Sequence, residues 1–367
     1  MRALRLAVSL LAAAALPLAF AASPALADHE DGRSGDAVYA STNAAAGNAV
    51  LAFERAPGGG LTPAGSFATG GAGTGAGLGN QGAIALVGDR LYVVNAGSGD
   101  ISVFAVRRHG LVLLDRVASA GTTPISLTIS RDVLYALNGG SGTIAGFRIG
   151  GRGLLRPIPG SVQPLAGAGP AEIAFAPDGR TLVVTNKGTN TIDTFAVGFF
   201  GRAGAAVSHP SNGATPFGFA FDPAGHAIVS EAQGGAAGAS TVSSYNVRNG
   251  VFASISASVP DLQGAACWVA VAQGGRFAYV ANTGSNDVSG YRIARDGSIS
   301  LLDASGITAQ AGAAPADVAE AGDRPALYVR NGGDGSISSY RERFDGSLLP
   351  TGTVTGIPAG ATGLAAE

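Results

Sequence analysis

One pattern recurs along this chain: an apolar run ending in Asn, a short Gly-containing turn, and a second run that closes on an aromatic residue. Its clearest copy is Phe277–Tyr291, FAYVANTGSNDVSGY. Alternating apolar residues on both sides of a turn rich in Asn and Gly are typical of a β-hairpin. Four further copies keep the Asn and the aromatic nine positions apart, as here, and they lie at Leu91–Phe104, Leu134–Phe147, Leu182–Phe195 and Leu327–Tyr340.

Two less regular copies, Val38–Phe53 and Ala227–Tyr245, bring the number of repeats to seven. The closing aromatics stand at 53, 104, 147, 195, 245, 291 and 340, so neighbouring copies are 43 to 51 residues apart. A period in the forties with strand signals alone indicates a β-propeller, in which each repeat is one four-stranded blade. Helical repeats need apolar residues every three to four positions, and these windows lack that spacing. A pair of β-sandwiches fits an uninterrupted repeat poorly, so we predict an all-β, seven-bladed propeller.

An additional strand signal precedes each hairpin from the second repeat onward. These inner-strand signals lie at Gly82–Asp89, Pro124–Ser130, Pro170–Gly179, Pro216–Gly225, Ala266–Gly275 and Pro315–Asp323. The first repeat, at about residues 37–67, has no such strand ahead of it, whereas Ala361–Glu367 repeats the signal with nothing after it. We therefore expect the last strand to pair into the first blade and close the ring, which removes the free sheet edges.

The N-terminal residues have the three parts of a secretory signal peptide. Arg2 and Arg5 are followed by an apolar stretch and by small residues up to Ala27, so we expect residues 1–27 to be removed on export to the cell envelope or outside. Residues 28–36 are charged and are expected to form a loose lead-in, and residues 37–367 to form a single propeller domain. The Gly-rich stretch Gly70–Asn80 suggests a phosphate-binding loop, but no Lys follows it. We interpret it as a flexible connector.

Charge and cysteine content narrow the range of partners. The formal net charge is −2 and the sequence has no basic run, so neither nucleic acid nor an anionic membrane has an electrostatic reason to bind. Apart from residues 1–27, no apolar run is long enough to span a bilayer. Cys267 is the sole cysteine, which excludes an internal disulfide, and the four His residues share no metal-ligand spacing. We expect a monomer without metal or cofactor.

The residues that break the repeat are the candidates for function. Asn95, Asn138, Asn186, Asn282 and Asn331 recur, and we interpret them as turn residues, since Asn tolerates left-handed backbone and caps its own turn. Glu231 stands at the Asn position of one repeat, while Lys187 and Arg330 are charged neighbours of that position in two others. At an aligned position of the inner strands, three repeats carry Glu172, Trp268 and Asp317.

These charged groups and the Trp have two interpretations. On one face of a propeller they would form a site for a small polar ligand, with Trp268 supplying a flat surface and the charges fixing orientation. Alternatively, they are scattered surface charges and a Trp that fills the channel, since structural ion pairs are common.

The repeats resemble those of the lactonase-type seven-bladed propellers, which include 6-phosphogluconolactonases, carboxymuconate-cyclising enzymes and the related YVTN-repeat surface proteins. The resemblance covers residues 37–367 and rests on YVANTGSNDVSGY and its siblings, on PDGR at Pro177–Arg180 and on YASTN at Tyr39–Asn43. It implies that Glu231, in IVSEA, corresponds to a Glu that the family places in its fifth blade. The family's Arg-His pair in that blade is replaced by Phe217–Gly218, and a His-containing segment of the preceding blade reads GPAEIAF, Gly169–Phe175.

Two classes of function remain open. One is an exported lactonase-like enzyme, with Glu231 as general base and with Arg330 or Lys187 holding an anion. The other is a non-catalytic extracellular propeller that binds a small molecule, a glycan or a protein. Because phosphorylated intermediates stay inside cells, export argues against a cytosolic sugar-phosphate substrate.

Overall fold

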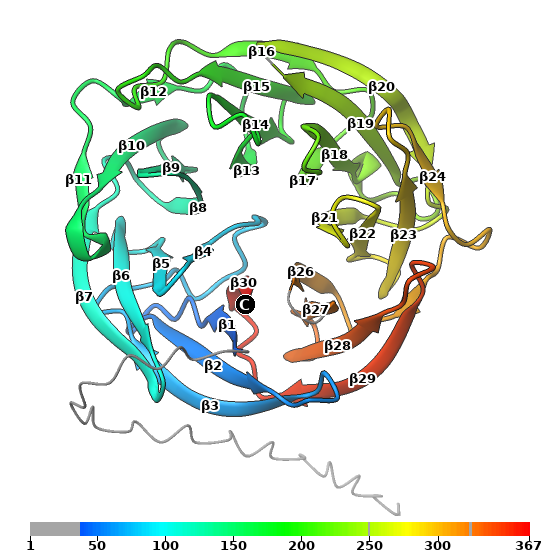
Figure 1. Ribbon diagram of the computed structural model, residues 1–367, viewed down its shortest axis with the longest axis horizontal. Helices are drawn as coiled ribbons and strands as arrows, with labels where there is room; N and C mark the ends of the chain where they lie inside the picture. The colour runs from blue at the N-terminus through cyan, green and yellow to red at the C-terminus, as the bar shows by residue number, and fades with distance from the viewer. Residues whose placement is uncertain (1–36, 249, 323–324) are drawn as a thin grey trace, which may run out of the picture.

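The computed structural model describes residues 37–248, 250–322 and 325–367, and it confirms the seven-bladed propeller. Seven antiparallel sheets stand around a common centre, with the innermost strand of each sheet facing that centre (Figure 1). The expected signal peptide and lead-in lie outside the described residues. None of the helices in the described part of the chain is long and apolar enough to cross a membrane.

Each blade runs from an innermost to an outermost strand. The innermost strands are β30 (Thr362–Ala366), β4 (Ile84–Val87), β8 (Pro124–Ser130), β13 (Pro170–Phe175), β17 (Pro216–Phe221), β21 (Ala266–Ala272) and β26 (Pro315–Ala321). The second strands are β1 (Ala37–Ser41), β5 (Arg90–Asn95), β9 (Val133–Asn138), β14 (Thr181–Asn186), β18 (His226–Glu231), β22 (Phe277–Asn282) and β27 (Ala326–Asn331).

The third strands are β2 (Ala49–Arg55), β6 (Asp100–Arg107), β10 (Thr143–Ile149), β15 (Thr191–Ala196), β19 (Thr241–Arg248), β23 (Asp287–Ile293) and β28 (Ser336–Glu342). The outer strands are β3 (Leu61–Ala68), β7 (Gly110–Ala118), β16 (Val207–Pro210), β20 (Val251–Pro260) and β29 (Leu348–Thr355), and in two blades the outer strand is broken into β11 (Leu155–Pro157) with β12 (Gln163–Pro164) and β24 (Ile299–Leu301) with β25 (Ala309–Gln310). Two short 3-10 turns complete the described elements, η1 (Gly151–Gly153) and η2 (Gln233–Gly235).

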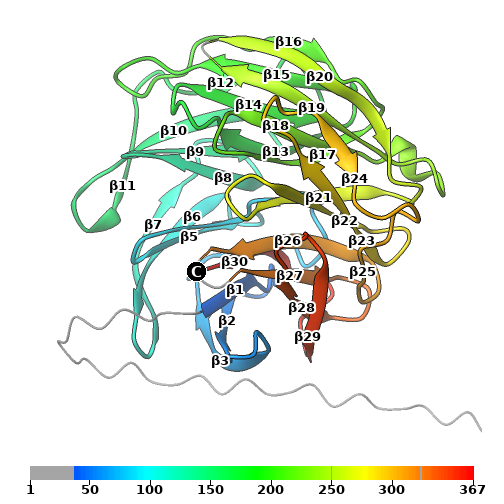
Figure 2. The same cartoon turned by 45° about the vertical axis from the view of Figure 1, so that its right-hand side comes forward.

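The ring closes as the sequence predicts. β30 pairs antiparallel with β1, with Tyr39 opposite Ala365 and Ala40 opposite Leu364. Leu364 is buried in the cluster that also holds Phe53. The two ends of the described chain are thus neighbours in one sheet (Figures 1 and 2).

The aromatic residues that close the repeats fill the seams between blades. All seven are at most 2% exposed, and each belongs to a different buried cluster that also contains residues of the preceding blade. Phe147, for example, packs with Tyr92 and Val103 of the preceding blade. Full burial of such a ring contributes about 1.5–3 kcal/mol.

The antiparallel order of strands gives the ring two faces. One face, which we call the mouth face, carries the turns between second and third strands and the connections between blades. The other, the base face, carries the turns that join first to second and third to fourth strands. The recurring Asn residues end the second strands and therefore lie at the mouth face.

The interpretation of Gly70–Asn80 as a flexible connector is wrong. Residues 77–82, which we call the plug segment, reach into the centre of the ring just before β4 (Figure 1). Gly82 accepts a hydrogen bond from Leu127 N at 2.8 Å, Asn80 bonds Ile125 O, and Thr362 Oγ1 donates to Asn80 Oδ1 at 2.8 Å. The preceding glycines allow close backbone approach, since a Cβ on Gly73 would lie 2.1 Å from the Asn43 carbonyl carbon.

Deleting residues 361–367 is expected to lower the stability of the entire ring, because it leaves the inner edge of β1 unpaired and exposes the seam around Phe53. Thermal unfolding should shift to lower temperature as one cooperative transition. A loss confined to the first blade, seen as local proteolysis with an unchanged melting temperature, would contradict this expectation.

Candidate functional site

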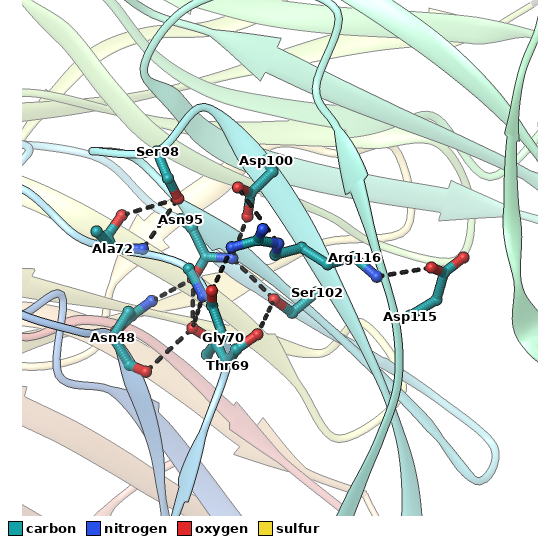
Figure 3. A network of polar contacts seen from close by, with 11 residues as sticks. Asn48, Thr69, Gly70, Ala72, Asn95, Ser98, Asp100, Ser102, Asp115 and Arg116 are labelled. Carbon is teal, nitrogen blue, oxygen red and sulfur yellow. Dashed lines mark hydrogen bonds and ion pairs between the residues drawn. The ribbon is translucent and has the colours of Figure 1, made fainter.

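Three of the five recurring Asn side chains, Asn95, Asn282 and Asn331, bind across their own hairpins. Asn95 Nδ2 donates to Asp100 Oδ1 at 2.6 Å and to Ser102 Oγ at 2.8 Å, both on the following strand (Figure 3). Its Oδ1 accepts hydrogen bonds from Asn48 Nδ2 and Thr69 Oγ1 of the preceding blade, at 2.9 and 2.7 Å. One buried amide therefore fixes a hairpin and a blade seam together.

The same pattern recurs in other blades, where Asn282 bonds Asp287 and Ser289, and Asn331 bonds Ser336. None of the five recurring Asn residues has positive φ, so the left-handed conformation expected for them is wrong. The signal that sequence reasoning missed is the pair of polar residues five and seven positions after the Asn. In these three blades it marks the Asn as a buried donor between strands, whereas Asn138 donates to Ser119 O and the Asn186 side chain has no hydrogen-bond partner among the described residues.

Glu231 takes the Asn position in the blade with the lengthened turn. Its side chain is fully buried, and its Oε1 accepts hydrogen bonds from Ser243 Oγ at 2.6 Å and Gly213 N at 2.8 Å. Oε2 accepts from Thr241 Oγ1 at 2.5 Å and Ser258 Oγ at 3.1 Å. At Asn95, neighbouring side chains accept hydrogen bonds from the amide nitrogen. At Glu231, neighbouring hydroxyls instead donate hydrogen bonds to the carboxylate. The geometry gives Glu231 a structural function, and its catalytic role stays a prediction.

Three of the other predicted residues lie along the channel wall of adjacent blades. Lys187 Nζ lies 4.6 Å from the centre of the Phe217 ring, and that ring meets Trp268 edge-on with centroids 5.0 Å apart. Trp268 Nε1 donates to Pro315 O at 3.3 Å, two residues before Asp317. Burial lowers the pKa of Lys187 below its usual range. These contacts form a continuous arc from β14 to β26.

The carboxyls of this arc have raised pKa values because they are buried. Burial raises the pKa of Asp317 to about 7, although the neighbouring Arg330 charge acts to lower it. The pKa of Glu172 lies well above its usual range, chiefly through burial and further through Asp317. Arg330 stands opposite Asp317 in the β26–β27 register and donates from Nη2 to Ala316 O at 2.7 Å.

These carboxyls also hold the innermost strands together. Glu172 Oε2 accepts a hydrogen bond from Phe219 N of the next blade at 2.7 Å, and the backbone N–H of Leu364 on β30 acts to lower the pKa of Asp317. Asp317 Oδ2 nevertheless has no hydrogen-bond partner, and neither has Arg330 Nε. A buried polar atom without a partner is costly, so this end of the arc has unused capacity to bind a polar group.

The plug segment occupies the space left free because Gly218 has no side chain. Gln81 Oε1 accepts from Val269 N at 3.1 Å, and Gln81 Nε2 donates to Val269 O at 2.8 Å. A Cβ on Gly218 would lie 2.3 Å from Gln81 Oε1. Lys187 Nζ donates to Gly79 O at 2.5 Å. Four of the six predicted site residues, Glu172, Lys187, Trp268 and Asp317, thus lie on the wall of a channel closed by the chain itself, and Arg330 stands behind Asp317.

A hollow of about 440 Å³ opens elsewhere on the mouth face, at the seam between the first two blades. Small residues line it, together with Asn48, Ser98 and Arg116. The Arg116 guanidinium bonds Gly70 O and forms an ion pair with Asp100 (Figure 3). Arg116 Nε lies 3.8 Å from Asp100 Oδ2. Within residues 37–248, 250–322 and 325–367, no three His, Cys, Asp or Glu side chains gather as metal ligands would.

Residues 154–259 match the family model described as "Lactonase, 7-bladed beta-propeller". The resemblance to lactonase-type propellers is confirmed. Solved lactonase-type propellers share the fold. A putative 6-phosphogluconolactonase from Bacteroides fragilis superimposes with a TM-score of 0.72 at 18% identity, covering 93% of this chain and 100% of its own. The periplasmic gluconolactonase PpgL of Pseudomonas aeruginosa gives 0.68 at 16% identity, covering 90% and 99%. No curated protein sequence matches the chain.

Replacing Glu231 with Gln is expected to destabilise the protein by about 1–3 kcal/mol, because an amide nitrogen would then face hydroxyls that donate to the carboxylate. Urea unfolding measures the change, and Glu54→Gln, at an exposed position in β2, is the matched control. Unchanged stability together with lost lactone hydrolysis would instead support the catalytic role.

Proposed function

We propose that the protein hydrolyses a small carboxylated lactone at the mouth of the central channel. The observation that carries the proposal is the arc of ionisable groups with shifted pKa values, Glu172, Lys187, Asp317 and Arg330, beside an aromatic pair. Such clusters are characteristic of functional sites. The lactonase-type resemblance supports the choice of lactones as the substrate class.

In this proposal Asp317 is the general base. Its pKa of about 7 places it between its two protonation states near neutral pH, and Oδ2 is free to accept a proton. Water adds to the lactone carbonyl carbon as Asp317 takes its proton. The ring C–O bond then breaks, and the released alkoxide takes the proton back. Arg330 and Lys187 supply the positive charge that a substrate carboxylate or developing oxyanion needs.

Substrate reaches this arc only when the plug segment moves. Gln81 and Asn80 are held by side-chain hydrogen bonds to three strands, β8, β21 and β30, which makes their displacement the step that controls access. A loop that covers a site and opens for substrate commonly limits turnover.

Asp317→Asn is expected to lower kcat for lactone hydrolysis by about 10²–10⁴-fold, the usual contribution of a general base. In the wild type, activity should rise with pH through about 7, because the deprotonated carboxylate is the active form.

Gln81→Ala, which removes two bonds to Val269, should raise kcat/KM. Purified protein is assayed against a panel of lactones, with Asp345→Asn on the base face as control. Failure of both wild type and Gln81→Ala to open any lactone would overturn the proposal.

A second candidate is non-catalytic binding of a small anionic ligand. It is favoured by the closed channel and by the hollow lined by Ser98 and Arg116, whose side chain is 47% exposed. Calorimetric titration of small carboxylates and acidic sugars would show loss of binding in Arg116→Gln and no change in Asp317→Asn. If the first proposal holds, Asp317→Asn loses lactone hydrolysis and Arg116→Gln keeps it.

We also propose that the protein is exported, on the signal-peptide pattern of residues 1–27. The periplasmic gluconolactonase PpgL, which has a similar fold, supports this location. Expression of the full chain should yield a processed protein that begins at Asp28 outside the cytoplasm. Retention of Met1 on cytoplasmic protein would count against export.

A further inference from the structure

Two adjacent phenylalanines stand exposed at a turn of the base face. Phe199 is 94% exposed and Phe200 77%, in the turn between β15 and the outer strand β16. A third, Phe344, is 81% exposed in the corresponding turn between β28 and β29. Isolated exposed apolar residues are ordinary, but a pair of whole rings at one tip indicates contact with an apolar medium.

The turn that carries the pair is held firmly. Tyr135 Oη donates to Gly201 O at 2.8 Å and accepts from Ala203 N at 2.7 Å. Gly201 has φ of 76° and packs so closely that a Cβ would lie 2.9 Å from Val133 Cγ2. The phenylalanine rings, 5.3 Å apart between centroids, therefore project from a fixed support.

Arginines surround this tip. Arg148 Nη2 donates to Phe200 O at 3.0 Å and Arg202 Nε to Pro159 O at 3.1 Å, and both side chains line a hollow of about 310 Å³ with Phe200 and Ile158. Arg148 forms an ion pair with Asp132 at 2.6 Å. Arg202 has no ion-pair partner among the described residues, so its charge is available to an anion.

The arginines gather on the base face as a whole. The exposed ones at or next to its turns are Arg107, Arg108, Arg131, Arg152, Arg156, Arg180, Arg202, Arg248, Arg292, Arg295, Arg341 and Arg343. The exposed acids there are fewer, namely Glu54, Asp89, Asp132, Asp296 and Asp345. On the mouth face, Arg116 is the one exposed Arg or Lys among the described residues. The sequence has no basic run, yet the folded chain gathers these arginines on one face, because turns far apart in sequence share it.

We propose that the base face docks on a bilayer containing anionic phospholipid, with Phe199 and Phe200 entering the interface and the arginines binding headgroup phosphates. Basic charge combined with exposed aromatic rings is the combination that interfacial binding requires. A polyanion would use the arginines without the rings. The exposed phenylalanines stand in two different blades of one face, which suits contact with a plane.

The test uses the chain from Asp28 onward, which contains the whole closed ring and omits the apolar N-terminal residues that would bind lipid by themselves. Sedimentation with vesicles of phosphatidylcholine plus phosphatidylglycerol measures partitioning at about 0.1 M and about 0.5 M salt, since screening weakens only the electrostatic part. Wild type should bind the mixed vesicles, bind pure phosphatidylcholine far less, and release at the higher salt.

The double variant Phe199→Ser/Phe200→Ser should lower the partition coefficient about tenfold or more, and Arg148→Gln/Arg202→Gln should lower it on anionic vesicles only. Leu262→Ser, which changes a 53% exposed apolar residue of the mouth face, is the matched control and should bind as wild type does. Melting temperatures check that the variants fold. The proposal would be overturned if the wild type did not bind mixed vesicles. It would also be overturned if the Phe variant bound them as well as the wild type does, because vesicle binding would then be as insensitive to the Phe changes as binding to heparin.

Discussion

The contact between neighbouring blades is the interaction on which the rest of this structure depends. A single four-stranded sheet with two apolar faces cannot cover them alone, so each blade relies on the next. The closing aromatic of every repeat supplies that cover by packing in a cluster with residues of the preceding blade. For Phe53 of the first blade, the preceding blade is the last one in the chain. Seven equivalent seams set a fixed angle between sheets, and the central channel with its ring of inner strands follows from that angle.

Polar side chains secure the same seams at the mouth face. Asn95 shows how one amide can join a hairpin to the blade before it. Glu231 shows that the position accepts a different chemistry when the surrounding donors change with it. Buried polar networks of this kind specify one arrangement of strands when every member is satisfied.

The fold could be predicted because its signal is periodic, with an Asn and an aromatic at a constant distance in five copies. The inner strands and the pairing of residues 361–367 with the first blade followed from the same period. The plug segment could not be predicted, because Asn80 and Gln81 gain their partners from strands up to 282 residues away. The gathering of Glu172, Trp268 and Asp317 was predictable from their aligned positions on the inner strands, and Lys187 stands beside a recurring Asn on the same face. The burial that shifts the pKa values of Lys187 and the two carboxyls was not predictable.

Ring closure by β1 and β30 has a consequence for how the chain acquires its structure. The sheet that completes the circle is built from the first and last strands of the domain, so no partial product of synthesis contains it. Pairing of such distant segments carries a high loop-closure entropy and folds slowly. Until β30 has paired, the inner edge of β1 stays open, and an unpaired strand edge of this kind is a site at which chains associate with one another.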